Sequence, residues 1–337
     1  MTQLLRYQIR IESALGSPLR SDTLSGQILW AYREKHGEPA LEKLLLEVKD
    51  GNLPFVLSDG FPTGHLPVPT FPPIPRKWFH ALANKHCGGD LFQTLQLQKS
   101  RKNELAHIPL EYWSGLRSNA SLYALLDDWL PKVPKASWDQ RSVAEMHNVI
   151  DRFQNTTLSQ GGIFTVENTW MELSSADPSG SQSKKMLMDL YAQVRPDFQA
   201  EFDGLLEQIG KTGYGRDASI GLGQLRIERS EDVSNLLDCQ DPNRWLNLST
   251  LATTDGTSMR DGYYKIRPKF GKVWSGFGDN APFKKPILIL EAGSILGHVP
   301  APATMILQGV HPTNPKILQY TAGIFLPFVL NESISGE

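Results

Sequence analysis

The sequence has 337 residues, of which 40% are hydrophobic and 21% are charged. This composition is that of a globular protein, and it excludes a disordered chain and a long coiled coil. The 34 Lys and Arg residues nearly balance the 36 Asp and Glu residues, for a formal net charge of −2. A uniformly basic coat for nucleic acid is therefore excluded, whereas a local basic groove is not.

The two cysteines, Cys87 and Cys239, form no CxxC pair. A disulfide framework and a cysteine-rich zinc site are therefore not expected, and a reducing compartment fits best. No apolar run approaches the roughly 18–20 residues of a membrane span, and the first residues lack the apolar stretch of a signal peptide. We expect a cytoplasmic protein that does not associate with membranes.

The first 50 residues predict a strand followed by a helix. Apolar and polar residues alternate over residues 4–12, which indicates a half-buried strand. A helix should begin at Ser21 or Asp22, because a side-chain oxygen there can accept hydrogen bonds from its first N–H groups. Gly37 and Pro39 should end this helix.

The chain up to residue 230 continues with further predicted elements. They are a proline-rich edge strand or loop at 53–75, mixed helix and loop at 76–135, a strand at 163–173, a turn or disordered tip at 174–183, an amphipathic helix at 197–209 and a strand at 224–228.

These elements give a β-α-β…β-α-β order, which is that of the split βαβ (ferredoxin-like) fold with long insertions. A polar boundary follows at residues 232–243, and residues 245–330 are rich in strands with Gly and Pro between them. We therefore predict an α+β protein with a second, smaller domain.

Several possible catalytic and metal sites are discounted. Residues 204–212 (GLLEQIGKT) have one residue too many between the glycines for a phosphate loop, and they read as helix. His80, His86 and Cys87 lack a nearby fourth ligand for a metal ion. The GxSxG motif that carries the nucleophilic serine of many hydrolases is not present. The acidic residues Asp127, Asp128, Asp238 and Asp241 are expected on the surface.

A glycine-rich segment at residues 213–223 (GYGRDASIGLG), here named the glycine loop, stands between the last helix and the last strand of the first domain. Glycines let a ligand approach main-chain N–H groups, and such groups bind phosphate oxygens. Arg216 lies in the loop, and Arg suits phosphate contacts. The order helix–loop–strand excludes the dinucleotide fingerprint, and a tight connector without a ligand remains the alternative.

At this point the sequence resembles a known family, the RAMP proteins of CRISPR systems, whose glycine-rich loop follows the same helix. Further motifs are similar to those of the subunits that cap the 5′ end of the guide RNA in type III (Csm-type) effector complexes. The matching segments span nearly the whole chain: 17–26 (SPLRSDTLSG), 55–62 (FVLSDGFP), 66–69 (LPVP), 106–113 (AHIPLEYW), 148–152 (NVIDR), 162–167 (GIFTVE), 245–249 (WLNLS), 264–269 (YKIRPK), 271–275 (GKVWS) and 291–294 (EAGS).

The sequence also departs from the family pattern at three places. Arg20 stands where His is common, and His147-Asn-Val stands where Arg-Asn-Arg is usual. In the glycine loop, Gly215-Arg-Asp replaces Gly-Gly-Lys or Gly-Gly-Arg.

The resemblance implies two ferredoxin-like (RRM/RAMP) domains. The first, 1–230, would carry long insertions, including a β-hairpin thumb near 141–173 and the glycine loop, and the second, 240–330, would be a degenerate copy. The resemblance also implies a non-catalytic subunit without cofactor or metal that binds the 5′ handle of the crRNA. Such a subunit docks on the large subunit with the cyclase-type Palm domain and on the adjacent RAMP backbone subunit, and its thumb lies near the target RNA.

The expected RNA-binding residues lie in three regions, and each offers the RNA an N–H group, a charge or an aromatic ring. They are Arg20, Ser21 and Asp22 at the helix entrance, where helix N–H groups favour a phosphate; Arg141, His147, Asn148 and Arg152 in the thumb; and Gly213, Tyr214, Gly215, Arg216, Ser219, Gly221 and Trp274 in or beyond the glycine loop. Tyr214 and Trp274 are the candidate stackers for bases.

Two rival functions stay open. The first is a RAMP endoribonuclease that processes precursor crRNA, with His36 or His147 as general acid–base. No His precedes His36, which argues against it. The second is a ferredoxin-like interaction protein that binds no RNA.

Overall fold

The computed structural model describes residues 3–104, 106–131, 138–154, 156–158, 162–173, 187–273 and 282–334. It is an α+β structure built around a five-stranded antiparallel sheet. The strands run in the order β11 (Leu225–Asp232), β1 (Leu4–Ile11), β10 (Leu187–Val194) and β2 (Phe55–Leu57), and the short β3 (Phe61–Pro62) also pairs with β10. Helix α1 (Ser21–His36) follows β1, and α7 (Gln199–Thr212) joins β10 to β11. Helices and strands thus alternate in the expected β-α-β-β-α-β order.

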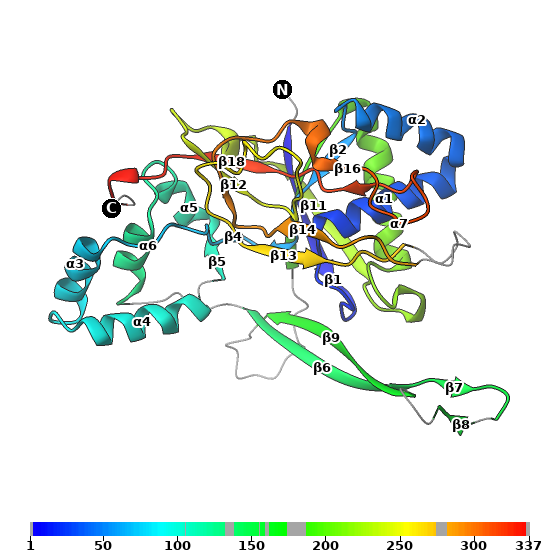
Figure 1. Cartoon of the computed structure of the whole chain (residues 1–337), viewed down its shortest axis with the longest axis horizontal. Coiled ribbons are helices and arrows are strands. Elements are labelled where there is room, and N and C mark those ends of the chain that lie inside the picture. Colours follow the sequence, from blue (N-terminus) through cyan, green and yellow to red (C-terminus); the bar gives the residue numbers. More distant parts are fainter. Residues whose placement is uncertain are drawn as a thin grey trace.

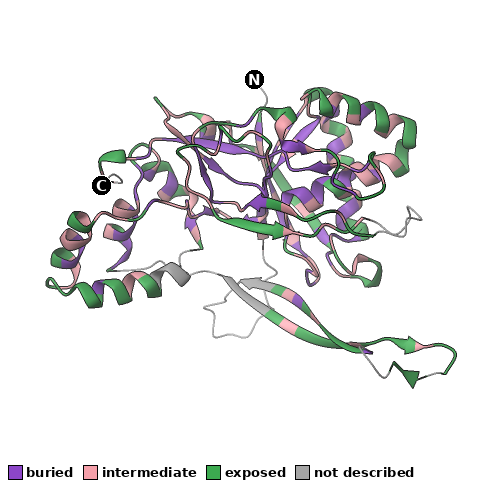
Figure 2. Cartoon of the chain, viewed as in Figure 1, coloured by how far each residue is buried: buried purple, intermediate pink, exposed green. Residues whose placement is uncertain are grey.

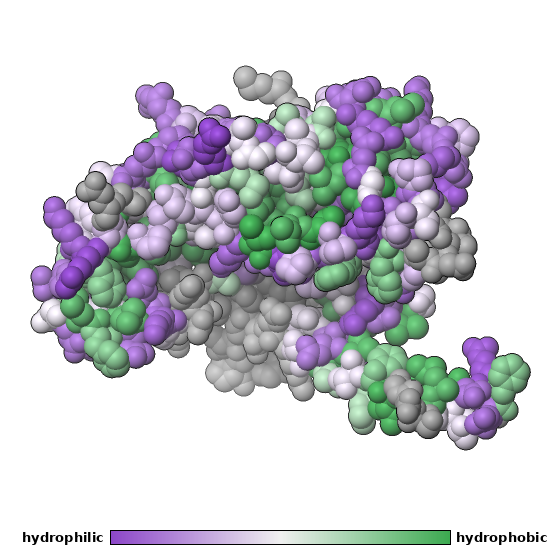
Figure 3. All heavy atoms as spheres, in the orientation of Figure 1, coloured by the Kyte–Doolittle hydropathy of each residue, from purple (hydrophilic) through white to green (hydrophobic). Residues whose placement is uncertain are grey.

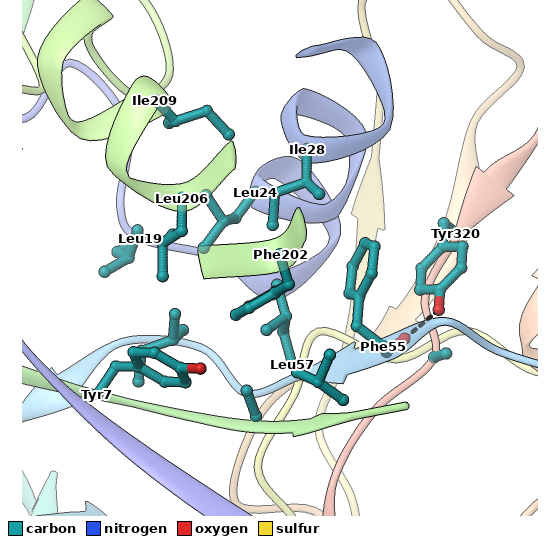
Figure 4. Close-up of a cluster of buried hydrophobic side chains, with 14 of the residues drawn as sticks. Tyr7, Leu19, Leu24, Ile28, Phe55, Leu57, Phe202, Leu206, Ile209 and Tyr320 are labelled. Atoms are coloured by element: carbon teal, nitrogen blue, oxygen red, sulfur yellow. Dashed lines mark hydrogen bonds between the residues drawn. The ribbon is translucent and has the colours of Figure 1, made fainter. Parts of the chain in front are cut away.

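Helices α1 and α7 pack on one face of this sheet, and α2 (Glu38–Lys49) packs against α1. Figure 4 shows the side chains between these layers, with Leu24 and Ile28 from α1 meeting Phe202 and Leu206 from α7. Tyr7 on β1 is nearly fully buried, which fits the alternation seen in the sequence. This cluster is the larger hydrophobic core of the protein.

A helical segment is inserted between β4 (His65–Pro67) and the hairpin described next (Figure 1). It consists of α3 (Arg76–His86), α4 (Leu91–Glu104), α5 (Leu110–Leu116) and α6 (Leu122–Trp129), and β5 (His107–Pro109) pairs with β4. The buried Trp113 ring meets the Phe328 ring at 5.4 Å in a second core.

A long antiparallel hairpin projects from the body of the molecule (Figure 1). Strand β6 (Trp138–Asn148) pairs along its whole length with β9 (Ile163–Leu173), and the small ribbon of β7 (Ile150–Asp151) and β8 (Thr156–Thr157) lies beyond them. Most of its described residues are exposed (Figure 2). The strand predicted over residues 163–173 is confirmed.

The C-terminal part consists of short strands and 3-10 turns. A three-stranded sheet holds β15 (Ile295–Leu296), β12 (Arg244–Asn247) and β18 (Phe325–Phe328), and two ribbons pair β13 (Ile266–Lys269) with β14 (Ile287–Leu290) and β16 (Ile306–Leu307) with β17 (Gln319–Tyr320). The 3-10 helices among the described residues are η1 (Pro196–Phe198), η2 (Ala218–Ile220), η3 (Ser234–Leu237), η5 (Pro302–Met305) and η6 (Glu332–Ile334). Residues 240–273 and 282–334 contain no α-helix, so a degenerate ferredoxin-like second domain stays a prediction.

Both hydrophobic cores take residues from both predicted domains. Leu251, Leu290 and Tyr320 belong to the larger core with β1 and α1, while Leu4 and Tyr191 of the first sheet belong to the second. The Tyr320 hydroxyl donates to the Phe55 carbonyl across this junction (Figure 4). The polar segment at 232–243 therefore does not separate two independently packed cores.

Candidate nucleic-acid interface

The glycine loop folds back on itself between α7 and β11. Gly213 and Gly223 have φ values of 102° and 71°, in the left-handed region that favours glycine. A Cβ on Gly213 would lie 2.6 Å from the Leu222 carbonyl oxygen, and one on Gly223 would overlap the Tyr214 carbonyl. The close packing of the loop on itself therefore requires these two glycines before any ligand is considered.

Tyr214 is fully buried, so the prediction that its ring stacks on a base is wrong for this structure. Its hydroxyl donates to the Pro18 carbonyl at 2.7 Å and accepts from the Arg20 N–H at 2.9 Å. Burial raises the pKa of this hydroxyl. The side chain therefore anchors the loop to the segment that enters α1, because its hydroxyl satisfies two main-chain groups at once.

Arg216 is partly exposed but already has several partners. Its Nη2 donates to the Glu167 carbonyl at 2.7 Å and to Asn168 Oδ1 at 3.1 Å, both on strand β9. Its Nε lies 3.2 Å from the Asp217 carboxylate. The structure thus brings the glycine loop to the hairpin, which the sequence did not indicate.

The outer side of the loop offers donors to a ligand. Within the described part of the chain, the main-chain N–H groups of Asp217 and Ser219 have no hydrogen-bond partner. Ser219 and Gly221 are exposed, and Asp217 adopts φ 63°. Successive N–H groups in such a turn form a small anion-binding concavity. These groups, with the free edge of Arg216, make up the candidate anion site.

The entrance of α1 does not serve as the expected phosphate site. The buried Asp59 carboxylate accepts from the Ser21 N–H at 2.8 Å and from the Thr250 N–H at 2.9 Å. The Arg20 Nη1 lies 3.0 Å from the other Asp59 oxygen. Although burial opposes it, this ion pair raises the pKa of Arg20. An anion of the protein itself therefore occupies the helix entrance, so the prediction for Ser21 is wrong.

Asp22 is likewise committed within the protein, and its prediction as an RNA contact is wrong. Its side chain is fully buried, with Lys269 Nζ at 2.5 Å and Gln319 Nε2 at 2.9 Å from Oδ2. Lys284 donates to Gln319 Oε1 at 2.8 Å, and burial lowers its pKa to about 8 although nearby Asp22 opposes the shift. This polar cluster joins α1 to the β13–β14 and β16–β17 ribbons.

The hairpin holds His147, Asn148 and Arg152 at its outer part. The His147 ring stacks on Phe164 at 5.6 Å, Asn148 Nδ2 donates to Thr157 Oγ1 at 3.2 Å, and Arg152 is exposed. The Arg141 side chain and Trp274 lie outside the described residues. The partners of His147 and Asn148 described here, Phe164 and Thr157, also belong to the hairpin.

Sequence reasoning missed a set of exposed apolar side chains on the hairpin. Phe153 is fully exposed, and Met146 and Ile163 are 82% and 67% exposed. Figure 3 shows apolar residues gathered over the outer hairpin. Exposed apolar groups of this kind mark contact surfaces. The signal was weak in the sequence, because an apolar residue in a strand normally indicates burial.

The described residues were also considered for metal-binding groups and for membrane-spanning helices. Among the described residues there is no group of three or more His, Cys, Asp or Glu that could hold a metal ion. None of the helices described here is both long and apolar enough to cross a bilayer.

No protein-family model matches the sequence, and no curated protein matches it. The fold, in contrast, is similar to several solved structures. Two are Csm1-Csm4 cassettes in complex with AMPPNP and with pppApA, with TM-scores of 0.55 and 0.54 and sequence identities of 15% and 14%. Each match covers 97% of this chain and 98% of the other.

A third similar structure is the Csm3-Csm4 subcomplex in the type III-A CRISPR-Cas interference complex. Its TM-score is 0.54 at 14% identity, and the match covers 97% of this chain and 99% of the other. Csm4 is the component that these assemblies have in common. The resemblance found in the sequence is therefore confirmed at the level of the fold, and this chain has, over nearly its whole length, the fold of the Csm4 subunits of type III CRISPR-Cas complexes.

Proposed function

We propose that this chain is a non-catalytic crRNA-binding subunit of a type III (Csm-type) CRISPR effector complex, in which it caps the 5′ handle of the guide. It docks on the large Palm-domain subunit and on the adjacent RAMP backbone subunit, and its hairpin serves as the thumb near the target RNA. The observation that carries the proposal is the full-length fold match to Csm4 in assemblies with either Csm1 or Csm3. The sequence motifs listed above support the same assignment.

The glycine loop is the part of the surface that fits the RNA best. It combines main-chain donors near Asp217 and Ser219 with one cation, Arg216. Main-chain amides bind phosphate oxygens whatever the base. This composition suits the backbone of an RNA end, and base readout would come from other residues.

The endoribonuclease alternative has less support. His36 lies in the last turn of α1, about 13 Å along the helix from Gln27, whose Oε1 accepts from the Gly215 N–H of the glycine loop. Its Nε2 lies 2.8 Å from Glu201 Oε1, and Lys35 Nζ donates to Glu201 Oε2 at 2.8 Å. His147 stacks on Phe164 on the outer hairpin.

The test is RNA binding by the purified chain and by complexes assembled with its neighbouring subunits. Ser219→Glu places a carboxylate beside the loop donors and should weaken binding of a 5′-handle RNA roughly fivefold to tenfold. Ser230→Glu makes the same change at an exposed serine of β11 and should have little effect. Each lost single-strand phosphate contact should also reduce the salt slope by about 0.7.

Equal effects of the two variants would remove the glycine loop from the RNA site. Failure of guide RNA to copurify with complexes that contain the chain would favour the interaction protein without RNA. Metal-independent cutting of repeat RNA that is lost in His36→Ala or His147→Ala would establish the nuclease instead.

A further inference from the structure

Residues 167–169 of β9, here called the root of the hairpin, contact the body of the protein. Leu15, in the connection from β1 to α1, and Thr169 exchange two main-chain hydrogen bonds of 2.9 and 3.0 Å. The neighbouring Asn168 is only 1% exposed, whereas most described hairpin residues are exposed (Figure 2). The root is therefore packed against the body of the protein.

Arg216 fastens the glycine loop to the same point. Its Nη2 holds both the Glu167 carbonyl and Asn168 Oδ1, on the two residues before Thr169. On the other side, a Cβ on Gly16 would lie 2.5 Å from the Arg216 carbonyl oxygen, and the Arg216 N–H donates to Ser17 Oγ at 3.3 Å. The β1–α1 connection, the glycine loop and strand β9 thus meet in one junction centred on Arg216.

We propose that Arg216 is a positioning residue that fixes the root of the hairpin to the glycine loop, and that RNA binding at the loop is coupled to the placement of the hairpin. The inference rests on the proposed function. Nε and Nη2 of the guanidinium are engaged within the protein, and Nη1 has no partner among the described residues. A bidentate grip on phosphate is therefore blocked, but a single contact through Nη1 is compatible with the junction.

The sign of the coupling follows from this geometry. The junction holds Nη1 and the N–H groups near Ser219 in one fixed arrangement, so a phosphate that contacts both binds the joined state without the cost of ordering the loop and the arginine. Binding therefore favours the joined state, and by linkage a broken junction weakens binding. The buried Asn168 should affect RNA affinity although it cannot touch the RNA.

The first measurement follows hydrogen exchange at the Leu15 and Thr169 amides by NMR in the full chain without RNA. Asn168→Ala and Arg216→Lys each remove part of the junction, and both should speed exchange at these amides about tenfold or more. Arg216→Lys keeps the charge and loses the planar fork. The matched control is Arg226→Ala. It removes an exposed arginine of β11 whose Nη1 lies 4.0 Å from Glu12 Oε1, away from the junction. Unchanged exchange in both junction variants would overturn the positioning role.

The second measurement is the affinity of the same variants for a 5′-handle RNA. Asn168→Ala should weaken binding about fivefold or more with an unchanged salt slope, because no phosphate contact is lost. Wild-type affinity in Asn168→Ala, together with faster exchange, would overturn the coupling and leave the proposed function standing. A wild-type chain that binds no handle RNA would instead refute the proposed function and the coupling, while the exchange data still decide the role of Arg216.

Discussion

At the scale of single residues, the chain uses polar groups within its body where the sequence suggested contacts to RNA. Tyr214 is the main example, because its buried hydroxyl satisfies two main-chain groups, and at the α1 entrance the buried Asp59 carboxylate binds the N–H groups of Ser21 and Thr250 where a phosphate was expected. A buried polar atom without a partner is costly, so such groups are constrained by the fold itself. The residues at these motif positions are therefore constrained by the stability of the fold as well as by binding.

Tyr214→Phe should lower the free energy of unfolding by about 1–3 kcal/mol, because the Arg20 N–H and the Pro18 carbonyl lose their shared buried partner. Urea unfolding of the full chain measures this loss. Tyr112→Phe is the control, because its hydroxyl meets Asp128 at the surface, and its cost should be about 1 kcal/mol or less. Equal losses in the two variants would contradict the anchoring role of Tyr214.

At the scale of elements, α1 is held at its first turn by distant parts of the chain. No side chain of its own caps it: Arg20 is the N-cap residue, and the Asp59 carboxylate supplies the acceptor. Asp22 then ties the same turn to Lys269 of β13 and to Gln319 of β17. The placement of α1 therefore depends on the C-terminal ribbons as much as on its own sequence.

Asp22→Asn should destabilise the protein by about 3 kcal/mol at pH 7, because it leaves Lys269 and Lys284 without their shared counter-charge. The deficit should shrink towards pH 9.5. The pKa of Lys284 is lowered to about 8, below its unfolded value, so the unfolded state binds more protons above that pH and stability rises with pH. Loss of Asp22 lowers the pKa of Lys284 further, so the stability of the variant begins to rise at a lower pH.

Urea unfolding at pH 7 and at pH 9.5 measures both effects. The matched control is Glu42→Gln, which breaks the exposed pair with Lys316 and should change stability by less than about 1 kcal/mol. A loss of stability in Asp22→Asn that does not change with pH would show that Lys284 does not interact electrostatically with Asp22.

At the scale of the whole molecule, the two predicted domains behave as one packed unit. Leu251, Leu290 and Tyr320 complete the core beneath α1 and α7, and the Asp59 carboxylate binds Thr250. The hairpin and the helical segment extend outward from this body (Figure 1). A fold of this kind presents several separate surfaces, which agrees with the proposed docking on two protein neighbours.

A fragment of residues 1–239 should not fold cooperatively, because it lacks the C-terminal side chains of both cores. Thermal unfolding followed by near-ultraviolet circular dichroism, with dye binding to exposed apolar surface, measures this. The full chain is the reference and should show a sharp transition. A sharp transition in the fragment would mean that the first domain is independent after all.

The sequence by itself determined the elements whose pattern is local. The alternation over residues 4–12, the apolar stripe of 197–209 and the strand at 163–173 correspond to β1, α7 and β9. It missed α2, because Gly37 and Pro39 read as the end of one helix although Gly37 only separates two. Pro39 is tolerated there in the first turn of the second helix.

Only the tertiary structure decided what the motif residues do. Asp59 reaches the α1 entrance across 38 positions, Arg216 reaches Asn168 across 48, and Gln319 reaches Asp22 across 297. Periodicity and spacing report on neighbours within a few residues, so they cannot show which carboxylate fills a helix entrance or which ring is buried. The sequence located the glycine loop, and the packing of distant segments around it buried Tyr214 and left the outer N–H groups and one edge of Arg216 open to a ligand.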